Sequence, residues 1–200
     1  YLGARAPMDI ELMIHALLGT ALLASGAAAL NQLIERRQDA LMQRTNGRPL
    51  PSGRLQPETV LAFGLASAAG GLGWLVLAVT PLTALVGLVT LCAYLFLYTP
   101  LKQVTWMNTL VGAIPGALPP VMGWTAARGE VSAGGWALFG IVALWQLPHF
   151  FAIAWLYRED YARAGFKMLP QVDPEGRRTA RLSVAFTLAL LVASVCPFAL

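Results

Sequence analysis

The sequence predicts an all-α fold, a multi-span bundle of transmembrane helices. Apolar runs near 20 residues long recur along the 200 residues, and a helix of that length spans a bilayer. Only 12% of the residues are charged, about half the usual share in a soluble domain, and the mean hydropathy is +0.62. The basic residues also gather in alternate loops. These observations exclude a soluble enzyme, and a net charge of +4 is too small to indicate nucleic acid binding.

Six segments are apolar enough to span a bilayer, roughly residues 12–30, 59–80, 82–98, 106–124, 134–157 and 182–200. No internal repeat or shift in composition marks a second domain, so we expect residues 1–200 to form a single transmembrane domain. The sequence begins with Tyr1 and ends inside an apolar run at Leu200, so we expect it to be truncated at both ends.

The basic residues predict how the spans are oriented. Twelve of the fourteen lysines and arginines lie in the loops after the first, third and fifth segments, and the other two are Arg5 and Arg128. This alternation follows the positive-inside rule and places the three polar loops together on the cytoplasmic face. We therefore expect an integral protein of a bacterial inner membrane, or of the mitochondrial inner membrane if the source is eukaryotic. Its active site would face the cytoplasm or the matrix.

The longest polar stretch, residues 31–53, directly follows the first apolar segment. If the helix continues, Asn31, Glu35 and Asp39 recur every four residues and share one face. Two carboxylates one turn apart repel each other, and Mg²⁺ between them removes that cost, since it usually binds one or two carboxylates plus substrate phosphates. Arg44 and Arg48 follow and suit the remaining phosphate oxygens. The stretch therefore indicates a Mg²⁺–diphosphate site, with an ordinary charged loop between two spans as the alternative.

The fourth apolar segment contains Pro115, Pro119 and Pro120 together with several glycines. Irregular backbone at membrane depth is tolerated where it is buried in protein or lines a cavity. We expect a broken helix that lines a cavity. The alternatives are a kinked helix and a short helix that ends near Pro119.

Three further positions are candidates. Lys102, in the short loop after the third segment, is a third cation for a diphosphate, or alternatively a lysine that anchors the span at the membrane surface. Asn108 opens the fourth segment. His149 lies ~12 Å inside the fifth span, where an ionisable side chain is a functional candidate and a hydrogen bond to a neighbouring helix is the alternative. A six-helix cytochrome would need two histidine haem ligands at one depth in the membrane. His15 lies ~24 Å along the first helix from Asn31, near the opposite surface, so a cytochrome with His15 and His149 as ligands is disfavoured.

An acidic and aromatic block follows the fifth segment and contains Tyr157, Asp160 and Tyr161. Asp160, or less favourably Glu159, is a candidate to hold a second metal ion or to close over a substrate. The alternative is an amphipathic surface segment, because aromatic and basic residues are common at that interface.

These stretches resemble the UbiA superfamily of intramembrane prenyltransferases. The resemblance is carried by NQLIERRQDALMQRTNGRPLPSG from Asn31, YTPLKQVTWMNT from Tyr98 with GAIPGALPP after it, and WQLPHF followed by YREDYARAGFKMLP. The last two stretches favour the branch that farnesylates haem over the quinone and chlorophyll branches. The resemblance implies nine helices around a central cavity, of which this chain would hold about six.

The resemblance also implies a Mg²⁺-dependent enzyme that joins farnesyl diphosphate to the vinyl group of haem B, giving haem O for terminal oxidases. The implied partners are these two substrates, the lipid bilayer, and haem A synthase or oxidase assembly factors. Among the residues, Asn31, Glu35 and Asp39 would hold Mg²⁺ and, with Lys102, would be catalytic. Arg44, Arg48 and Lys102 would bind the diphosphate. His149 and Asn108 would face the haem.

Two features depart from the superfamily's pattern. Glu35 stands where the pattern has an aspartate, so the carboxylate is kept on a longer arm. The second aspartate pattern would fall on Tyr157 and Tyr161, which leaves only Asp160 nearby and leaves open whether a second Mg²⁺ binds.

Other functions stay open at this point. Within the same class, the acceptor would be an aromatic or quinone precursor, and the acceptor consumed discriminates the two. Outside it, the chain would be a polytopic transporter in which Glu35 and Asp39 couple ions, with flux that needs no prenyl diphosphate. A haem-binding assembly factor is a third alternative, which the separation of His15 and His149 disfavours.

Overall fold

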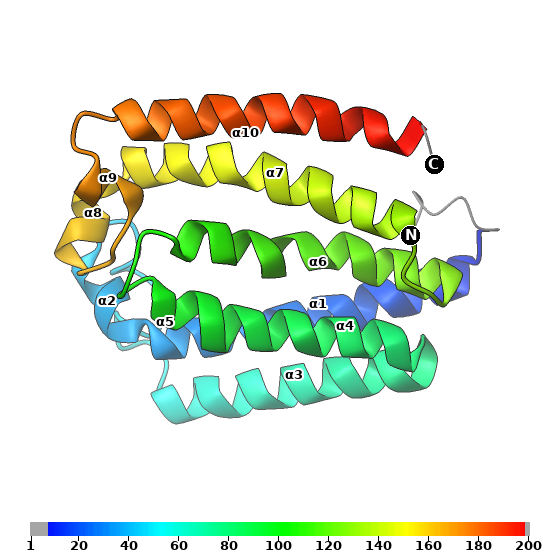
Figure 1. Cartoon of the computed structure of the whole chain (residues 1–200). Helices are drawn as coiled ribbons and strands as arrows, with labels where there is room; N and C mark the ends of the chain where they lie inside the picture. Colours follow the sequence, from blue (N-terminus) through cyan, green and yellow to red (C-terminus); the bar gives the residue numbers. More distant parts are fainter. Residues whose placement is uncertain (1–7, 199–200) are drawn as a thin grey trace.

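The computed structural model describes residues 8–198, and all regular structure in that range is helical. Six long helical spans lie side by side, and the short helices that follow the first and fifth spans gather at one end of the bundle (Figure 1). The spans are α1 (Ile10–Ile34), α3 (Pro57–Ala78), the composite of α4 (Pro81–Cys92), η2 (Ala93–Tyr98) and α5 (Thr99–Leu101), α6 (Asn108–Arg128), α7 (Ala133–Leu156) and α10 (Arg177–Val195). The other helices are α2 (Arg36–Leu41), α8 (Arg158–Arg163), α9 (Leu169–Val172) and η3 (Cys196–Phe198).

All six predicted spans are therefore confirmed as helices long and apolar enough to cross a membrane. Their boundaries differ from the predicted ones by a few residues, because polar residues extend several helices at the polar end. Tyr1, Arg5 and Leu200, which entered the predictions about chain ends and loop charge, lie outside the described residues.

Glycines allow α1 and α3 to pack backbone against backbone. A Cβ atom added at Gly26 would lie 2.6 Å from the backbone nitrogen of Ala68, and one added at Gly71 would lie 2.6 Å from that of Leu23. Small residues permit this approach between helices in a bilayer, where van der Waals packing replaces the hydrophobic effect as the attraction. The contact fixes the course of α1 and so the position of the polar stretch that begins at its end.

The expectation of a broken fourth span is wrong, because α6 runs without interruption from Asn108 to Arg128. The alternative of a helix that ends near Pro119 is wrong as well. Each proline removes one N–H donor, but the residues around it keep theirs. Of the six spans α6 is the most buried, and it packs on α4 and α7, so tertiary contacts hold the backbone helical where local propensity alone would not.

The third span contains a π-helical turn, η2. Both the backbone N–H and the hydroxyl of Thr99 donate to the carbonyl of Tyr94, five residues back. Pro100 follows and has no N–H with which to continue an α-helical pattern. Turns of this kind are frequent at functional sites. Here the turn directs Tyr94 and Tyr98 into the same cavity.

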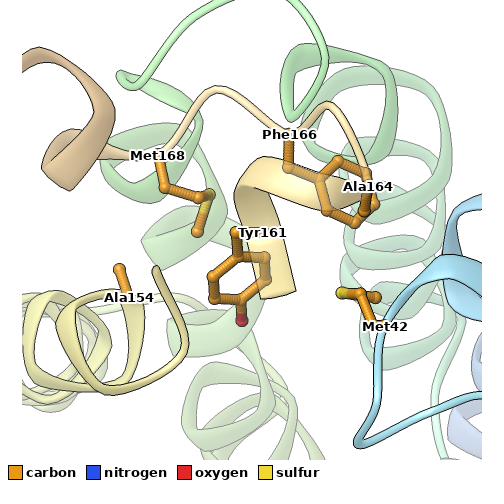
Figure 2. Packing of buried hydrophobic residues seen from close by; sticks show 6 residues of the cluster. All are labelled: Met42, Ala154, Tyr161, Ala164, Phe166 and Met168. Atoms are coloured by element: carbon orange, nitrogen blue, oxygen red, sulfur yellow. The ribbon is translucent and has the colours of Figure 1, made fainter. Parts of the chain in front are cut away.

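The polar end of the bundle has a small apolar core of its own. Figure 2 shows the ring of Tyr161 at its centre, between side chains from three parts of the chain. The members are Met42, Ala154, Tyr161, Ala164, Phe166 and Met168. The second polar loop joins the third through the backbone, since the N–H of Lys167 donates to the carbonyl of Lys102 at 2.6 Å. The three polar loops predicted to lie on one face are therefore packed together.

Asp173 caps α10 from the preceding loop. Its Oδ2 accepts hydrogen bonds from the backbone N–H of Thr179 at 2.7 Å and from the Thr179 hydroxyl at 2.8 Å. Desolvation raises the pKa of Asp173, but the donors of Thr179 and the backbone N–H and charge of Arg178 together bring it below its ordinary value. A folded pKa below the unfolded one means that the carboxylate stabilises the fold above about pH 4, and that this contribution is lost as the pH falls through the folded pKa.

We expect Asp173→Ala to lower the unfolding temperature at pH 7 by roughly 2–4 °C, the effect of one lost helix cap. Asp173→Asn keeps an acceptor oxygen and is expected to lose less. Thermal unfolding in detergent at pH 7 and pH 3 measures both effects, and the difference between wild type and Asp173→Ala should shrink at pH 3. An unchanged unfolding temperature at pH 7 would contradict the assignment of Asp173 as the cap.

Candidate active site

A cavity of about 490 Å³ lies at the polar end of the bundle, a size typical of small-molecule sites. Its walls come from α1, α2 and the loop after it, the third span, α6, α7, and α8 with the loop after it. All six residues predicted for metal and diphosphate binding line it: Asn31, Glu35, Asp39, Arg44, Arg48 and Lys102. The fold therefore brings together side chains that the sequence places in two separate loops.

The three predicted metal ligands keep their four-residue spacing across a break in the helix. α1 ends at Ile34, and Glu35 has φ −92° and ψ 9°, outside the helical range. The N–H of Glu35 still donates to the carbonyl of Asn31 at 2.9 Å, and the N–H of Asp39 donates to that of Glu35 at 2.8 Å. Asn31, Glu35 and Asp39 are 6%, 4% and 1% exposed. Carboxylates this deeply buried require positive partners.

Two of the predicted phosphate-binding cations are those partners. Arg48 Nη1 lies 2.8 Å from Asp39 Oδ2, and Lys102 Nζ lies 2.8 Å from Glu35 Oε1 and 2.9 Å from Oε2. Lys102 also lies 4.5 Å above the ring centroid of Tyr98. A metal ion at the carboxylates would displace these cations, and a diphosphate would give them new partners. The arrangement is therefore suited to take a metal ion and a diphosphate together.

Mg²⁺ fits this donor set only with ligands from a substrate. Between residues 8 and 198, no three His, Cys, Asp or Glu side chains are grouped closely enough to hold one ion. Glu35 and Asp39 supply two carboxylates and Asn31 an amide oxygen. Mg²⁺ characteristically keeps several waters and binds one or two carboxylates plus phosphate oxygens. The chemistry of the donors therefore matches Mg²⁺ bound with a diphosphate.

Thr99, which the sequence reasoning missed, orients Asn31. The Thr99 hydroxyl donates to the carbonyl of Tyr94 at 2.8 Å, so it accepts the hydrogen bond from Asn31 Nδ2 at 2.9 Å. That bond turns the amide oxygen of Asn31 away from Thr99 and makes it available as a ligand. A threonine next to Tyr98 in the span was the only sequence signal for this role.

The acidic and aromatic block surrounds Arg44. Tyr161 lines the cavity and its hydroxyl accepts a hydrogen bond from Arg44 Nη2 at 2.7 Å. The guanidinium carbon of Arg44 lies 4.9 Å from the ring centroids of both Tyr157 and Tyr161. Burial raises the pKa of the Tyr161 hydroxyl, which keeps it protonated. Asp160 does not line the cavity and bonds the loop after α2 instead.

The structure does not bring the two haem candidates to the cavity. Asn108 is fully buried, and its Nδ2 donates to the carbonyls of Thr105 at 2.7 Å and Lys167 at 2.8 Å, so it joins two loops. His149 is exposed on α7, does not line the cavity, and stacks on Trp145 with ring centroids 5.1 Å apart. The sequence placed His149 inside the fifth span, but α7 has no polar face that shows which side lies toward the cavity.

Residues 1–200 match the UbiA prenyltransferase family along their whole length. The chain belongs to this family. It is 54% identical over 190 residues to a protoheme IX farnesyltransferase from Solibacter usitatus, covering 95% of this chain and 65% of that protein. It is 47% identical over 196 residues to one from Salinibacter ruber, covering 98% and 69%. The chain thus spans about two thirds of the length of these relatives, and the resemblance read from its sequence motifs is confirmed at the level of the family.

Solved structures of the UbiA family share the fold. An apo UbiA homolog from Aeropyrum pernix K1 superposes with a TM-score of 0.81 at 23% identity, over 100% of this chain and 75% of the other. A UbiA homolog from Archaeoglobus fulgidus bound to GPP and Mg²⁺ gives 0.76 at 20% identity, over 98% and 68%. With its six apolar helices and membership of this family, the chain is an integral membrane protein.

The inner part of the cavity in this UbiA family member was predicted from the sequence only where the fourth span lines it. It is formed by polar, aromatic and small residues of three spans: Thr90, Tyr94, Thr109, Gly112, Pro115, Gly116, Gln146, Phe150 and Ile153. The proline-rich span therefore lines the cavity as expected, although it is not broken. Gln146 was the clearest missed signal, because it is a polar side chain in an apolar run. It packs against α6 where Gly116 has no side chain.

Proposed function

We propose that this protein transfers a farnesyl group from farnesyl diphosphate to the vinyl group of haem B, giving haem O and diphosphate. The observation that carries the proposal is the cavity in which Asn31, Glu35 and Asp39 lie beside Arg48 and Lys102. The names of the relatives at 54% and 47% identity support haem as the acceptor. The archaeal homologs bound to GPP or DMAPP with Mg²⁺ support a metal-dependent prenyl transfer.

Asn31, Glu35 and Asp39 would hold Mg²⁺ together with the diphosphate, and the bound ion would neutralise charge that builds on the leaving group. Arg44, Arg48 and Lys102 would bind the remaining phosphate oxygens. These cations are already in the cavity, so they stabilise the departing diphosphate without a costly rearrangement of solvent. That stabilisation is the main chemical task of the polar half of the site.

The apolar half of the cavity protects the allylic cation that is left when the diphosphate departs. Tyr94, Tyr98, Phe150 and Ile153 line this region and exclude bulk water. The terminal carbon of the haem vinyl group forms a bond to C1 of the farnesyl cation. A single water adds at the neighbouring carbon and loses a proton, which gives the hydroxyl of haem O.

The alternation of loop charge supports a polar end that faces the cytoplasm of a bacterium, or the matrix of a mitochondrion. This is the side on which a water-soluble diphosphate would be released. Membership of a prenyltransferase family favours this reaction over the transporter and assembly-factor alternatives. Haem A synthase or oxidase assembly factors would receive the product.

A product assay tests the proposal. The full-length protein in detergent is incubated with haem B and farnesyl diphosphate, with or without Mg²⁺, and the molecular mass of the extracted pigment is measured by mass spectrometry. We expect a haem heavier by one hydroxylated farnesyl chain, formed only with the metal. Prenylation of an added aromatic acid, with haem unchanged, would support prenyl transfer but show that the acceptor is an aromatic compound and not haem. No prenylated product from either acceptor would contradict the proposal as a whole.

A further inference from the structure

Asp160 holds the backbone of a loop that is more than one hundred residues away in the sequence. Its Oδ1 accepts the N–H of Gln43 at 3.2 Å, and its Oδ2 accepts the N–H of Arg44 at 3.3 Å. Arg163 forms an ion pair with the same carboxylate. Asp160 is 7% exposed, and both of these hydrogen bonds are partly buried. Both carboxylate oxygens are therefore occupied by donors from protein.

The protonation of Asp160 agrees with this role. Desolvation raises its pKa, but the backbone N–H groups of Arg44 and Gln43 and the charges of Arg163 and Arg44 outweigh that effect and hold the pKa below its ordinary value. Asp160 is thus a carboxylate at neutral pH. Hydrogen bonds to an ionised acceptor are about twice as strong as those between neutral groups.

The same block of sequence also holds the side chain of Arg44. The Tyr161 hydroxyl accepts one of its N–H groups, and its guanidinium lies against the rings of Tyr157 and Tyr161. A guanidinium has five N–H donors, so one bond to Tyr161 leaves others for a ligand. The backbone of Arg44 is fixed by Asp160 and its side chain by the tyrosines, and the residue lines the cavity.

Asp160 is poorly placed to be a metal ligand. Glu35 and Asp39 line the cavity, whereas Asp160 lies outside it and bonds the loop from behind. A metal ion at Asp160 would have to displace two backbone donors and an arginine. Those donors would then lose their partner in a partly buried position, which costs stability.

We propose that Asp160 is a positioning residue for the diphosphate site, which acts through Arg44 and does not bind metal. The inference rests on the proposed function, in which Arg44 binds the diphosphate of the prenyl donor. A guanidinium held in place before the ligand arrives loses less conformational freedom on binding, so the affinity for the diphosphate is higher. The acidic and aromatic block thereby contributes to the site without contacting the reacting atoms.

The test compares the binding of farnesyl thiodiphosphate, a slowly reacting analogue, to variants of the full-length protein in detergent. Isothermal titration calorimetry with saturating Mg²⁺ gives the affinity, and Mn²⁺ electron paramagnetic resonance gives the number of bound metal ions. We expect Asp160→Ala to weaken binding about tenfold and leave the number of Mn²⁺ ions unchanged. The double variant with Arg44→Ala should bind no more weakly than Arg44→Ala alone, because both substitutions remove the same contribution, that of Arg44 to diphosphate binding.

Glu159→Ala is the matched control. Glu159 was the less favoured metal candidate in the sequence, but its side chain is 80% exposed and does not line the cavity. The variant removes the same charge at the adjacent position, and its affinity should equal that of wild type. Tyr161→Phe removes only the hydroxyl that bonds Arg44. It therefore tests whether the positioning of Arg44 raises the affinity for the diphosphate, even if Asp160→Ala fails to fold. Its weakening should also disappear in the Arg44→Ala background.

Three results would overturn the inference. Loss of a bound Mn²⁺ ion in Asp160→Ala would make Asp160 a metal ligand. Weakening that adds to that of Arg44→Ala would mean that Asp160 does not act through Arg44. Wild-type affinity in Asp160→Ala would remove its role but leave the proposed function intact, whereas a wild-type protein that binds no prenyl diphosphate would remove both.

Discussion

Asp39→Asn is expected to lower the turnover number by about 10²–10³-fold, the usual effect of removing one group that stabilises charge in the transition state. Asp39 is 1% exposed and its Oδ2 lies 2.8 Å from Arg48 Nη1. Asparagine keeps the volume but removes the charge that would hold the metal ion. Steady-state kinetics with haem B and farnesyl diphosphate measure the change. Arg48→Ala is expected to have a comparable effect, since it removes a cation proposed to bind the diphosphate and leaves Asp39 without its ion-pair partner.

Glu58→Gln is the control for this prediction. Glu58 is exposed in the first turn of α3, and the variant makes the same change from acid to amide away from the cavity. It should turn over at the wild-type rate. The circular dichroism spectrum and elution volume of Asp39→Asn should match wild type, which shows that the fold is intact. Full activity in either Asp39→Asn or Arg48→Ala would contradict the assignment of these residues.

Gly71→Ala is expected to destabilise the fold by about 1–3 kcal/mol, the range for overpacking a close contact. The new Cβ would lie 2.6 Å from the backbone nitrogen of Leu23 and 2.8 Å from the carbonyl oxygen of Gly19. Backbone atoms do not yield as a flexible side chain does, so α1 must move away from α3. Because α1 carries Asn31 at its end, turnover should fall as well. Thermal unfolding in detergent and the product assay measure the two effects.

Gly70→Ala separates this contact from the general effect of losing a glycine. The adjacent residue has nothing within 4 Å of the position where a Cβ would lie. Alanine favours a helix more than glycine does, so Gly70→Ala should be neutral or stabilising by up to about 1 kcal/mol. Equal unfolding temperatures for the two variants would show that the close approach of α1 and α3 does not support the fold.

The spans were predictable because the length of an apolar run is a local property, set by the thickness of the bilayer. The continuity of α6 was not, because its three prolines argue for a break and only packing on α4 and α7 decides otherwise. The π-turn before Thr99 was missed for a related reason. Its effect depends on Tyr94 and Tyr98 facing a cavity that other helices complete.

The polar half of the site was predictable because Asn31, Glu35 and Asp39 recur at helical spacing, and because loop charge placed Lys102 on the same face. The ion pair of Lys102 with Glu35 and the hydrogen bonds of Asp160 to the loop after α2 were not, since each joins residues far apart in the sequence. The depth of His149 within its span did not indicate whether its side chain faces the cavity. α7 is apolar apart from Gln146 and His149, and its sequence does not show which of these two polar side chains faces the cavity.

Binding of farnesyl thiodiphosphate with and without Mg²⁺ tests the central claim most directly, namely that the face of Asn31, Glu35 and Asp39 holds a metal ion together with a diphosphate. Calorimetry on the full-length protein would compare wild type with Asp39→Asn. We predict tight binding by wild type only when Mg²⁺ is present, and binding by Asp39→Asn at the metal-free level under both conditions. Equal affinity in all four titrations would contradict the claim.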